Sequence, residues 1–72
     1  MKITLKAARV NAGLTQNAVI KLLGMSKTTL SNYETGRTSP DIETGKALAA
    51  LYGVSVNDII FLPSNRALST NS

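Results

Sequence analysis

Apolar residues recur at intervals of three and four along most of the chain, which is the spacing of amphipathic helices. The pattern predicts five helices, over residues 5–12, 16–23, 26–35, 41–52 and 55–62. The side chains expected on the buried faces of the first four are those of Leu5, Ala8, Ala12, Val19, Leu22, Leu23, Leu30, Tyr33, Ile42, Leu48, Ala49 and Tyr52, and the last helix has apolar side chains at Val56, Ile59 and Ile60. No segment has the alternating pattern of a strand, so the predicted fold class is all-α.

Capping residues mark the ends of the predicted helices. A residue that can accept a backbone N–H from the first turn stands before each helix, at Thr4, Thr15, Ser26, Asp41 and Ser55. Three helices are followed by a glycine, at Gly13, Gly24 and Gly53, and Pro63 ends the last one. Gly24 can adopt the positive φ that a tight turn needs. The second and third helices are therefore predicted to pack as a pair around this corner.

The length and the residue types limit what the chain can be. Its 72 residues contain no Cys and no His, so the packing of helices must stabilise one small domain, predicted over residues 1–62. Residues 63–72 contain few apolar side chains and are expected to form a flexible tail. The sequence has neither an ordinary signal peptide nor a membrane-spanning segment, and we expect a soluble cytoplasmic protein.

Catalysis is not expected from this composition. Without His or Cys there is no ordinary pair of nucleophile and base. The carboxylates are too scattered along the chain to predict a metal site, and they are Glu34, Asp41, Glu43 and Asp58. No glycine-rich phosphate loop is present. We therefore expect no cofactor, no metal and no small-molecule substrate.

The positive charge lies in the first half of the chain. Residues 1–38 contain six Lys or Arg residues and one acidic residue, a net charge of +5, whereas residues 39–72 have a net charge of −1. The basic half contains the predicted helix pair. Such a surface attracts a polyanion before any specific contact forms, although solubilising charge is a simpler explanation.

The exposed face of the third predicted helix is polar. If Leu30 and Tyr33 point inward, the side chains left outside are those of Lys27, Thr28, Ser31 and Asn32. This face offers hydrogen-bond donors and acceptors with one cation, which suits the reading of base edges in a major groove. A solvated helix face is the alternative.

With these residues placed, the chain resembles the phage repressor and Cro-type helix-turn-helix family. The resemblance covers about residues 5–61 and is carried by LKAAR at 5–9, GLTQ at 13–16, GMS at 24–26, TLSNYETG at 29–36, SP at 39–40 and LYGVSV at 51–56. It implies a compact five-helix bundle of the lambda-repressor type, with the third helix as the recognition helix. It also implies that the protein regulates transcription by binding operator DNA.

The resemblance assigns roles to individual residues. Lys27, Thr28 and Asn32, with Ser31, would face base edges, and the residues that contact the DNA backbone would be Gln16, Asn17, Ser26, Arg37 and Thr38. Arg9 and Glu34 match an ion pair that ties the first helix to the third. Ile20 and Gly45 depart from the usual pattern. Gly45 lies inside the fourth predicted helix, where it costs up to about 1 kcal/mol relative to Ala.

The apolar end of the predicted domain leaves two functions open. One short helix cannot bury Ile59, Ile60, Phe61 and Leu62 together, so this end forms either part of the core or a surface for a weak homodimer or a partner repressor. In the resembled family a two-fold dimer binds an inverted-repeat operator. The alternative to a DNA-binding regulator is a protein-binding modulator, antirepressor or antitoxin that docks on another regulator.

Overall fold

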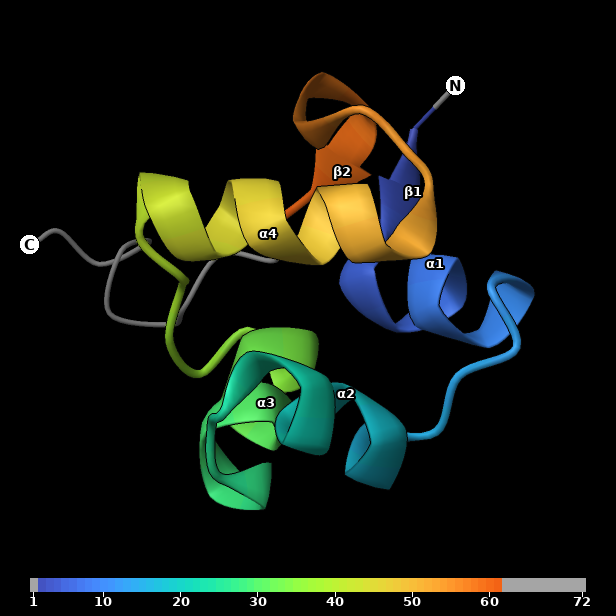
Figure 1. Cartoon of the computed structure of the whole chain (residues 1–72). Helices are drawn as coiled ribbons and strands as arrows, with labels where there is room; N and C mark the ends of the chain where they lie inside the picture. Colours follow the sequence, from blue (N-terminus) through green and yellow to red (C-terminus); the bar gives the residue numbers. More distant parts are fainter. Residues whose placement is uncertain (1, 62–72) are drawn as a thin grey trace, which may run out of the picture.

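The computed structural model describes residues 2–61, and the predicted tail at 63–72 and its boundary at residue 62 lie outside this range. The described part contains four α-helices, one short 3-10 helix and two short strands (Figure 1). In chain order these elements are β1 (Ile3–Thr4), α1 (Leu5–Asn11), α2 (Gln16–Leu23), α3 (Lys27–Thr35), α4 (Ile42–Tyr52), η1 (Val56–Asp58) and β2 (Ile59–Ile60).

The helices begin at the capping residues that the sequence predicts. The side chain of Thr4 accepts a hydrogen bond from Ala7 N, and that of Thr15 accepts one from Ala18 N, each at 3.1 Å. Asp41 caps α4 in the same way. Because an N-cap satisfies a backbone donor that has no partner within the helix, these short polar side chains fix where each helix starts. The prediction of the first four helices is confirmed, with small shifts at their ends.

The predicted fifth helix is wrong. Residues after Ser55 form only a single 3-10 turn, and Ile59 and Ile60 then extend as a strand parallel to β1, with Ile3 opposite Ile59 and Thr4 opposite Ile60. Isoleucine is branched at Cβ and fits a strand better than a helix. The expectation that no strand would occur is wrong for the same segment, because a two-residue strand is too short to show an alternating pattern.

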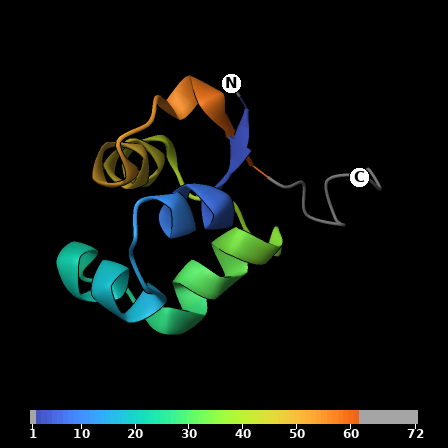
Figure 2. The ribbon, with the colours of Figure 1, turned by 90° about the vertical axis from the view of Figure 1, so that its right-hand side faces the viewer.

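Helix α1 lies between the two ends of the molecule. It contacts the strands and α4 on one side and α3 on the other. The strand pair lies at one end, and α2 and α3 lie at the opposite end (Figure 2). The buried apolar side chains where these elements meet are those of Leu5, Ala8, Val19, Leu30, Leu48, Ala49, Tyr52 and Ile59. This core holds the helix pair in a fixed position relative to α1.

Three residues that were expected to face the interior are exposed. Ala12 is the residue after the last turn of α1, so it has left the buried face of that helix. Leu22 is 62% exposed, because Val19 and Leu23 fill the inner face of α2. Ile42 is 75% exposed at the first turn of α4. Helical spacing identified a possible inner face, but the neighbouring elements do not cover all of it.

Gly45 lies where the end of the described chain crosses α4. A Cβ at this position would be 3.5 Å from Cζ of Phe61, which is ordinary van der Waals contact. The departure at Gly45 is therefore accommodated by the ring of Phe61, which packs over the glycine.

Within residues 2–61, no helix is long and apolar enough to cross a bilayer.

Candidate nucleic-acid interface

A rigid corner joins α2 to α3. Gly24 has a φ of +68°, and its N–H and that of Met25 both donate to the carbonyl of Ile20, at 2.8 and 3.2 Å. Ser26 then caps α3 by accepting a hydrogen bond from Thr29 N at 3.1 Å. The N–H groups of Gly24, Met25 and Thr29 are thus hydrogen-bonded by the glycine turn and the cap. The corner presents α3 in a defined orientation.

Helix α3 has one buried side and one polar side. Leu30 is fully buried and Glu34 is 7% exposed, so this side faces the core. Lys27 and Thr28 are exposed, and Ser31 and Asn32 are half-buried. All four residues that were predicted to read bases are therefore exposed or half-buried, and none of them is in the core. A docked duplex could reach this surface.

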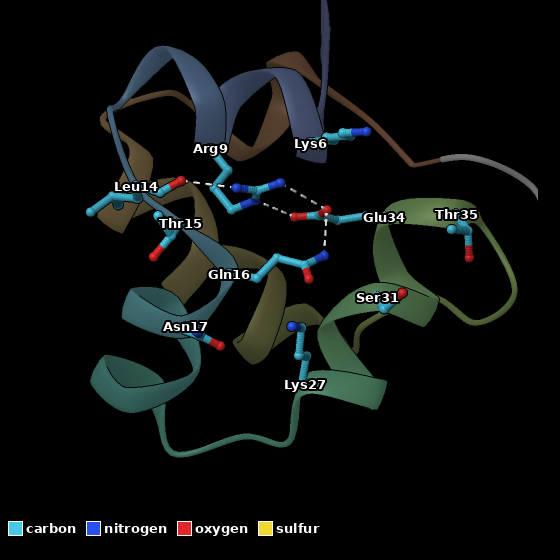
Figure 3. A pocket seen from close by; sticks show the side chains of 10 residues that line it. All are labelled: Lys6, Arg9, Leu14, Thr15, Gln16, Asn17, Lys27, Ser31, Glu34 and Thr35. Carbon is cyan, nitrogen blue, oxygen red and sulfur yellow. Dashed lines mark hydrogen bonds and ion pairs between the residues drawn. The ribbon is translucent and has the colours of Figure 1, made fainter.

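A buried network of hydrogen bonds supports α3 from below. Arg9 Nε donates to Glu34 Oε2 at 2.7 Å, and its Nη2 donates to Glu34 Oε1 at 3.3 Å (Figure 3). The remaining guanidinium nitrogen of Arg9, Nη1, donates to the carbonyl of Leu14 at 2.9 Å. The pair therefore links α1, the loop after it and α3. Because both charges are buried, loss of either partner would leave the other without compensation.

Gln16 joins this network from the first turn of α2. Its Nε2 donates to Glu34 Oε1 at 3.0 Å. The amide must present its nitrogen here, because two facing oxygens would repel each other. Gln16 consequently braces α3 and keeps a second N–H and its Oε1 for other partners.

The residues predicted to contact the DNA backbone differ in which hydrogen-bonding groups are already used within the protein. Asn17 is exposed at the start of α2. The hydroxyl of Ser26 donates to Thr29 Oγ1 at 2.8 Å, so its hydrogen is already used within the cap. Arg37 and Thr38 are exposed in the loop after α3, where their backbone N–H groups donate to Asn32 O at 3.0 and 3.3 Å. Their side chains remain available.

A hollow of about 530 Å³ opens between α1, α2 and α3. The buried network of Arg9, Gln16 and Glu34 lines it, together with Lys6 from α1, Asn17 from α2 and Lys27, Ser31 and Thr35 from α3. Lys6 and Thr35 are not among the site residues predicted from the sequence. Lys6 precedes Arg9 by three residues, so the two share a face of α1, and this spacing is the signal that could have identified it.

The surface predicted from Ile59, Ile60 and Phe61 is smaller than expected. Ile59 is only 5% exposed and belongs to the core, so it is corrected from a surface residue to a buried one. Its place opposite Ile3 in the strand pair explains the burial. Ile60 is 41% exposed and Phe61 is half-buried against Gly45. Strand geometry directs neighbouring side chains to opposite faces, which separates Ile59 from Ile60.

Tyr52 has a buried hydroxyl group that bonds to no other described residue. Burial and, to a smaller extent, the Glu34 carboxylate raise the pKa of Tyr52 to about 12, against a smaller lowering by Arg9. The group stays neutral at physiological pH.

Among residues 2–61, no three carboxylates are grouped so that they could hold a metal ion.

A polar helix that is held outward by a glycine corner and braced from beneath by a buried ion pair defines a helix-turn-helix domain. The sequence pattern of the helix-turn-helix family matches residues 5–59, and the chain belongs to this family of Cro-type regulators.

Curated relatives are similar to most of this chain. The chain is 38% identical over 52 residues to the cryptic phage CTXphi transcriptional repressor RstR of Vibrio cholerae, covering 72% of this chain and 47% of the repressor. It is 39% identical over 56 residues to the transcriptional regulator ImmR of Bacillus subtilis, covering 78% of this chain and 44% of ImmR. The chain thus spans less than half the length of these two relatives.

A shorter relative is matched over most of its length. The uncharacterized regulator MJ0272 of Methanocaldococcus jannaschii is 36% identical over 59 residues, which cover 82% of this chain and 89% of that protein. No solved structure gives a significant match. The family match over residues 5–59 includes α1 to α4 and so contains the helix pair.

Proposed function

We propose that the chain is a sequence-specific DNA-binding regulator of transcription, of the kind that represses genes in phages and mobile elements. The observation that carries the proposal is the polar side of α3, which is exposed or half-buried and is braced by the buried network of Arg9, Gln16 and Glu34. The name of RstR as a phage repressor supports this role.

The proposed mechanism places α3 in the major groove. Asn32 can pair with both donor and acceptor of adenine, Lys27 can donate to guanine, and the methyl group of Thr28 can contact the methyl of thymine. The backbone would be contacted by Gln16 and Asn17 at the start of α2 and by Arg37 and Thr38 after α3. These contacts set the register of the duplex, whereas the base contacts select its sequence.

Fluorescence anisotropy with the DNA that flanks the gene tests this proposal. The wild-type chain should bind this DNA more tightly than a random duplex, and the triple variant K27A, T28A and N32A should lose the difference. Each good bidentate contact is worth roughly 1–3 kcal/mol, or about fivefold to 150-fold in affinity. Lys46→Ala, which removes an exposed cation from α4, is the control and should keep the preference. Equal affinity of the wild type for both duplexes would reject sequence-specific binding.

We further propose that two copies bind an inverted-repeat operator. Dimerisation would place two α3 helices roughly 34 Å apart, one turn of DNA. Ile60, which is 41% exposed at the strand pair, is the apolar residue left from the predicted dimer surface. Sedimentation equilibrium should detect a weak dimer, and Ile60→Ser should reduce the dimer fraction. A wild-type chain that stays strictly monomeric and binds a half-site duplex as one copy would contradict the proposed dimer.

Docking on a partner repressor is the second candidate function. Four large apolar side chains are between 41% and 75% exposed, namely Val10, Leu22, Ile42 and Ile60, and such residues suit a protein contact. Repeating the anisotropy titration with the neighbouring regulator separates the two functions. If the chain binds DNA only when the regulator is present, the modulator function is supported.

A further inference from the structure

Positively charged side chains line the hollow between α1, α2 and α3. Arg9 is neutralised there by Glu34 at 2.7 Å. Lys6 and Lys27 also line the hollow, and within residues 2–61 neither has an ion-pair partner. Among the described residues, the hollow therefore holds two cations without an ion-pair partner. Figure 3 shows Lys6 on one side of the Arg9–Glu34 pair and Lys27 on the other.

The stripe of α3 beside this hollow is distinct from the stripe best placed to read bases. Lys27, Ser31 and Thr35 follow one another at intervals of four residues, so they form one line along the helix next to the hollow. Thr28 and Asn32 form the adjacent line and do not line the hollow. A helix of about 10–12 Å diameter fills a major groove that is about 12 Å wide. A DNA backbone must then run along the flank of the helix.

We propose that the hollow binds a backbone phosphate of duplex DNA and that Lys6 is a DNA-contacting residue of α1. The phosphate lies between the ammonium groups of Lys6 and Lys27, where the Asn17 amide and the hydroxyl groups of Ser31 and Thr35 can donate hydrogen bonds. The proposal rests on the proposed function and deepens it, because it extends the DNA-binding surface from the helix pair to α1. Lys27 and Ser31 then contact the backbone rather than a base, and Thr28 and Asn32 are left as the base-reading residues.

Lys6→Ala tests the proposal, with Lys46→Ala as the matched control. Both variants remove one exposed lysine from a helix and lower the net charge equally, but Lys46 lies on α4 beside Pro40 and Phe61. Affinity for a random-sequence duplex is measured by anisotropy between about 50 and 200 mM salt, since a phosphate contact needs no particular sequence. Circular dichroism establishes that each variant folds.

The expected result is a change in salt dependence that is confined to Lys6. Loss of one phosphate contact should make the slope of log K against log salt shallower by about 0.9 and weaken binding roughly fivefold to tenfold near 0.1 M salt. Lys6→Arg should retain wild-type binding. If K6A and K46A bind alike while the wild type still prefers its flanking DNA, this inference fails and the proposed function stands. If the wild type binds no duplex, both fail.

Chemical footprinting provides a second measurement without any substitution. Lysine acetylation followed by mass spectrometry should show Lys6 protected by the duplex and Lys46 modified as in the free protein. Inorganic phosphate at the same ionic strength is expected to leave Lys6 reactive, which separates a duplex site from a site for free phosphate. Equal modification of Lys6 with and without duplex, or protection by inorganic phosphate alone, would overturn the proposal.

Discussion

The carboxylate of Glu34 accepts hydrogen bonds from two other helices. One carboxylate oxygen accepts from Arg9 Nε, and the other accepts from Arg9 Nη2 and Gln16 Nε2. Its hydrogen bonds thus connect α3 to both α1 and α2. Because Arg9 and Glu34 are only 8% and 7% exposed, water can replace a lost partner only in part.

Glu34→Gln should destabilise the fold strongly, because it removes the charge that compensates the buried guanidinium of Arg9. We expect a loss of about 3–5 kcal/mol in the free energy of unfolding, measured by urea denaturation. The double variant R9M and E34L should recover much of this loss, since it leaves no buried charge. A single variant within about 0.5 kcal/mol of the wild type would show that the pair contributes little.

Gly45→Ala and Gly24→Ala should have opposite effects. At Gly45 the new methyl group would be 3.5 Å from the ring of Phe61, so Ala fits, and its higher helix propensity should stabilise the fold by about 0.5–1 kcal/mol. At Gly24 the φ of +68° strains any residue with a Cβ, and we expect a loss of about 1–2 kcal/mol. Thermal unfolding measures both. Destabilisation by Gly45→Ala would mean that Phe61 needs a bare backbone beneath it.

At the scale of elements, the start of α4 depends on an ionised side chain. Asp41 Oδ1 accepts a hydrogen bond from Thr44 N at 2.8 Å. This bond from the backbone, followed by the contribution of the Thr44 side chain, lowers the pKa of Asp41 below its ordinary value of 3.8. The folded state therefore favours the charged form more than the unfolded state does.

Acid should weaken α4 through this cap. Because the folded pKa is depressed, the stabilisation is complete above about pH 4, the ordinary range of an aspartate, and is lost as the pH falls through the lowered folded pKa. Asp41→Asn keeps a good N-cap but cannot titrate. Melting temperatures measured down to about pH 2 should fall more steeply for the wild type than for this variant. Parallel curves would show that the carboxylate charge is unimportant.

At the scale of the whole molecule, the strand pair ties the beginning of the described chain to its end. Ile3 lies opposite Ile59, and this contact spans nearly the full described sequence. The pairing turns Ile59 into the core and leaves Ile60 at the surface. In a helix over the same residues, the side chains of Ile59 and Ile60 would not point to opposite faces.

Ile59→Ala and Ile60→Ala distinguish the strand from the predicted helix. Ile59→Ala removes a side chain that is 5% exposed and should cost about 2–4 kcal/mol in urea denaturation. Ile60→Ala should change stability by less than about 1 kcal/mol, because its side chain is 41% exposed. Similar losses at both positions, independent of protein concentration, would be inconsistent with the strand geometry.

Much of this protein could be predicted from the sequence because the relevant interactions are local. Each N-cap bonds to a backbone group two or three residues ahead, and a glycine corner depends on its own φ. The first four helices and the polar side of α3 followed from these signals. The pairing of Arg9 with Glu34 came from a family resemblance, since no local pattern joins residues 25 positions apart.

Only the tertiary structure decided which apolar residues are covered and which polar residues meet. Leu22 and Ile42 have helical spacing, but no neighbouring element covers them. Ile59 and Ile60 became a strand because β1, at the other end of the sequence, supplies a partner. Folding also brings Lys6 of α1 to the hollow beside α3. A short segment fixes its own hydrogen bonds, whereas burial and long-range charge depend on surfaces that folding brings together.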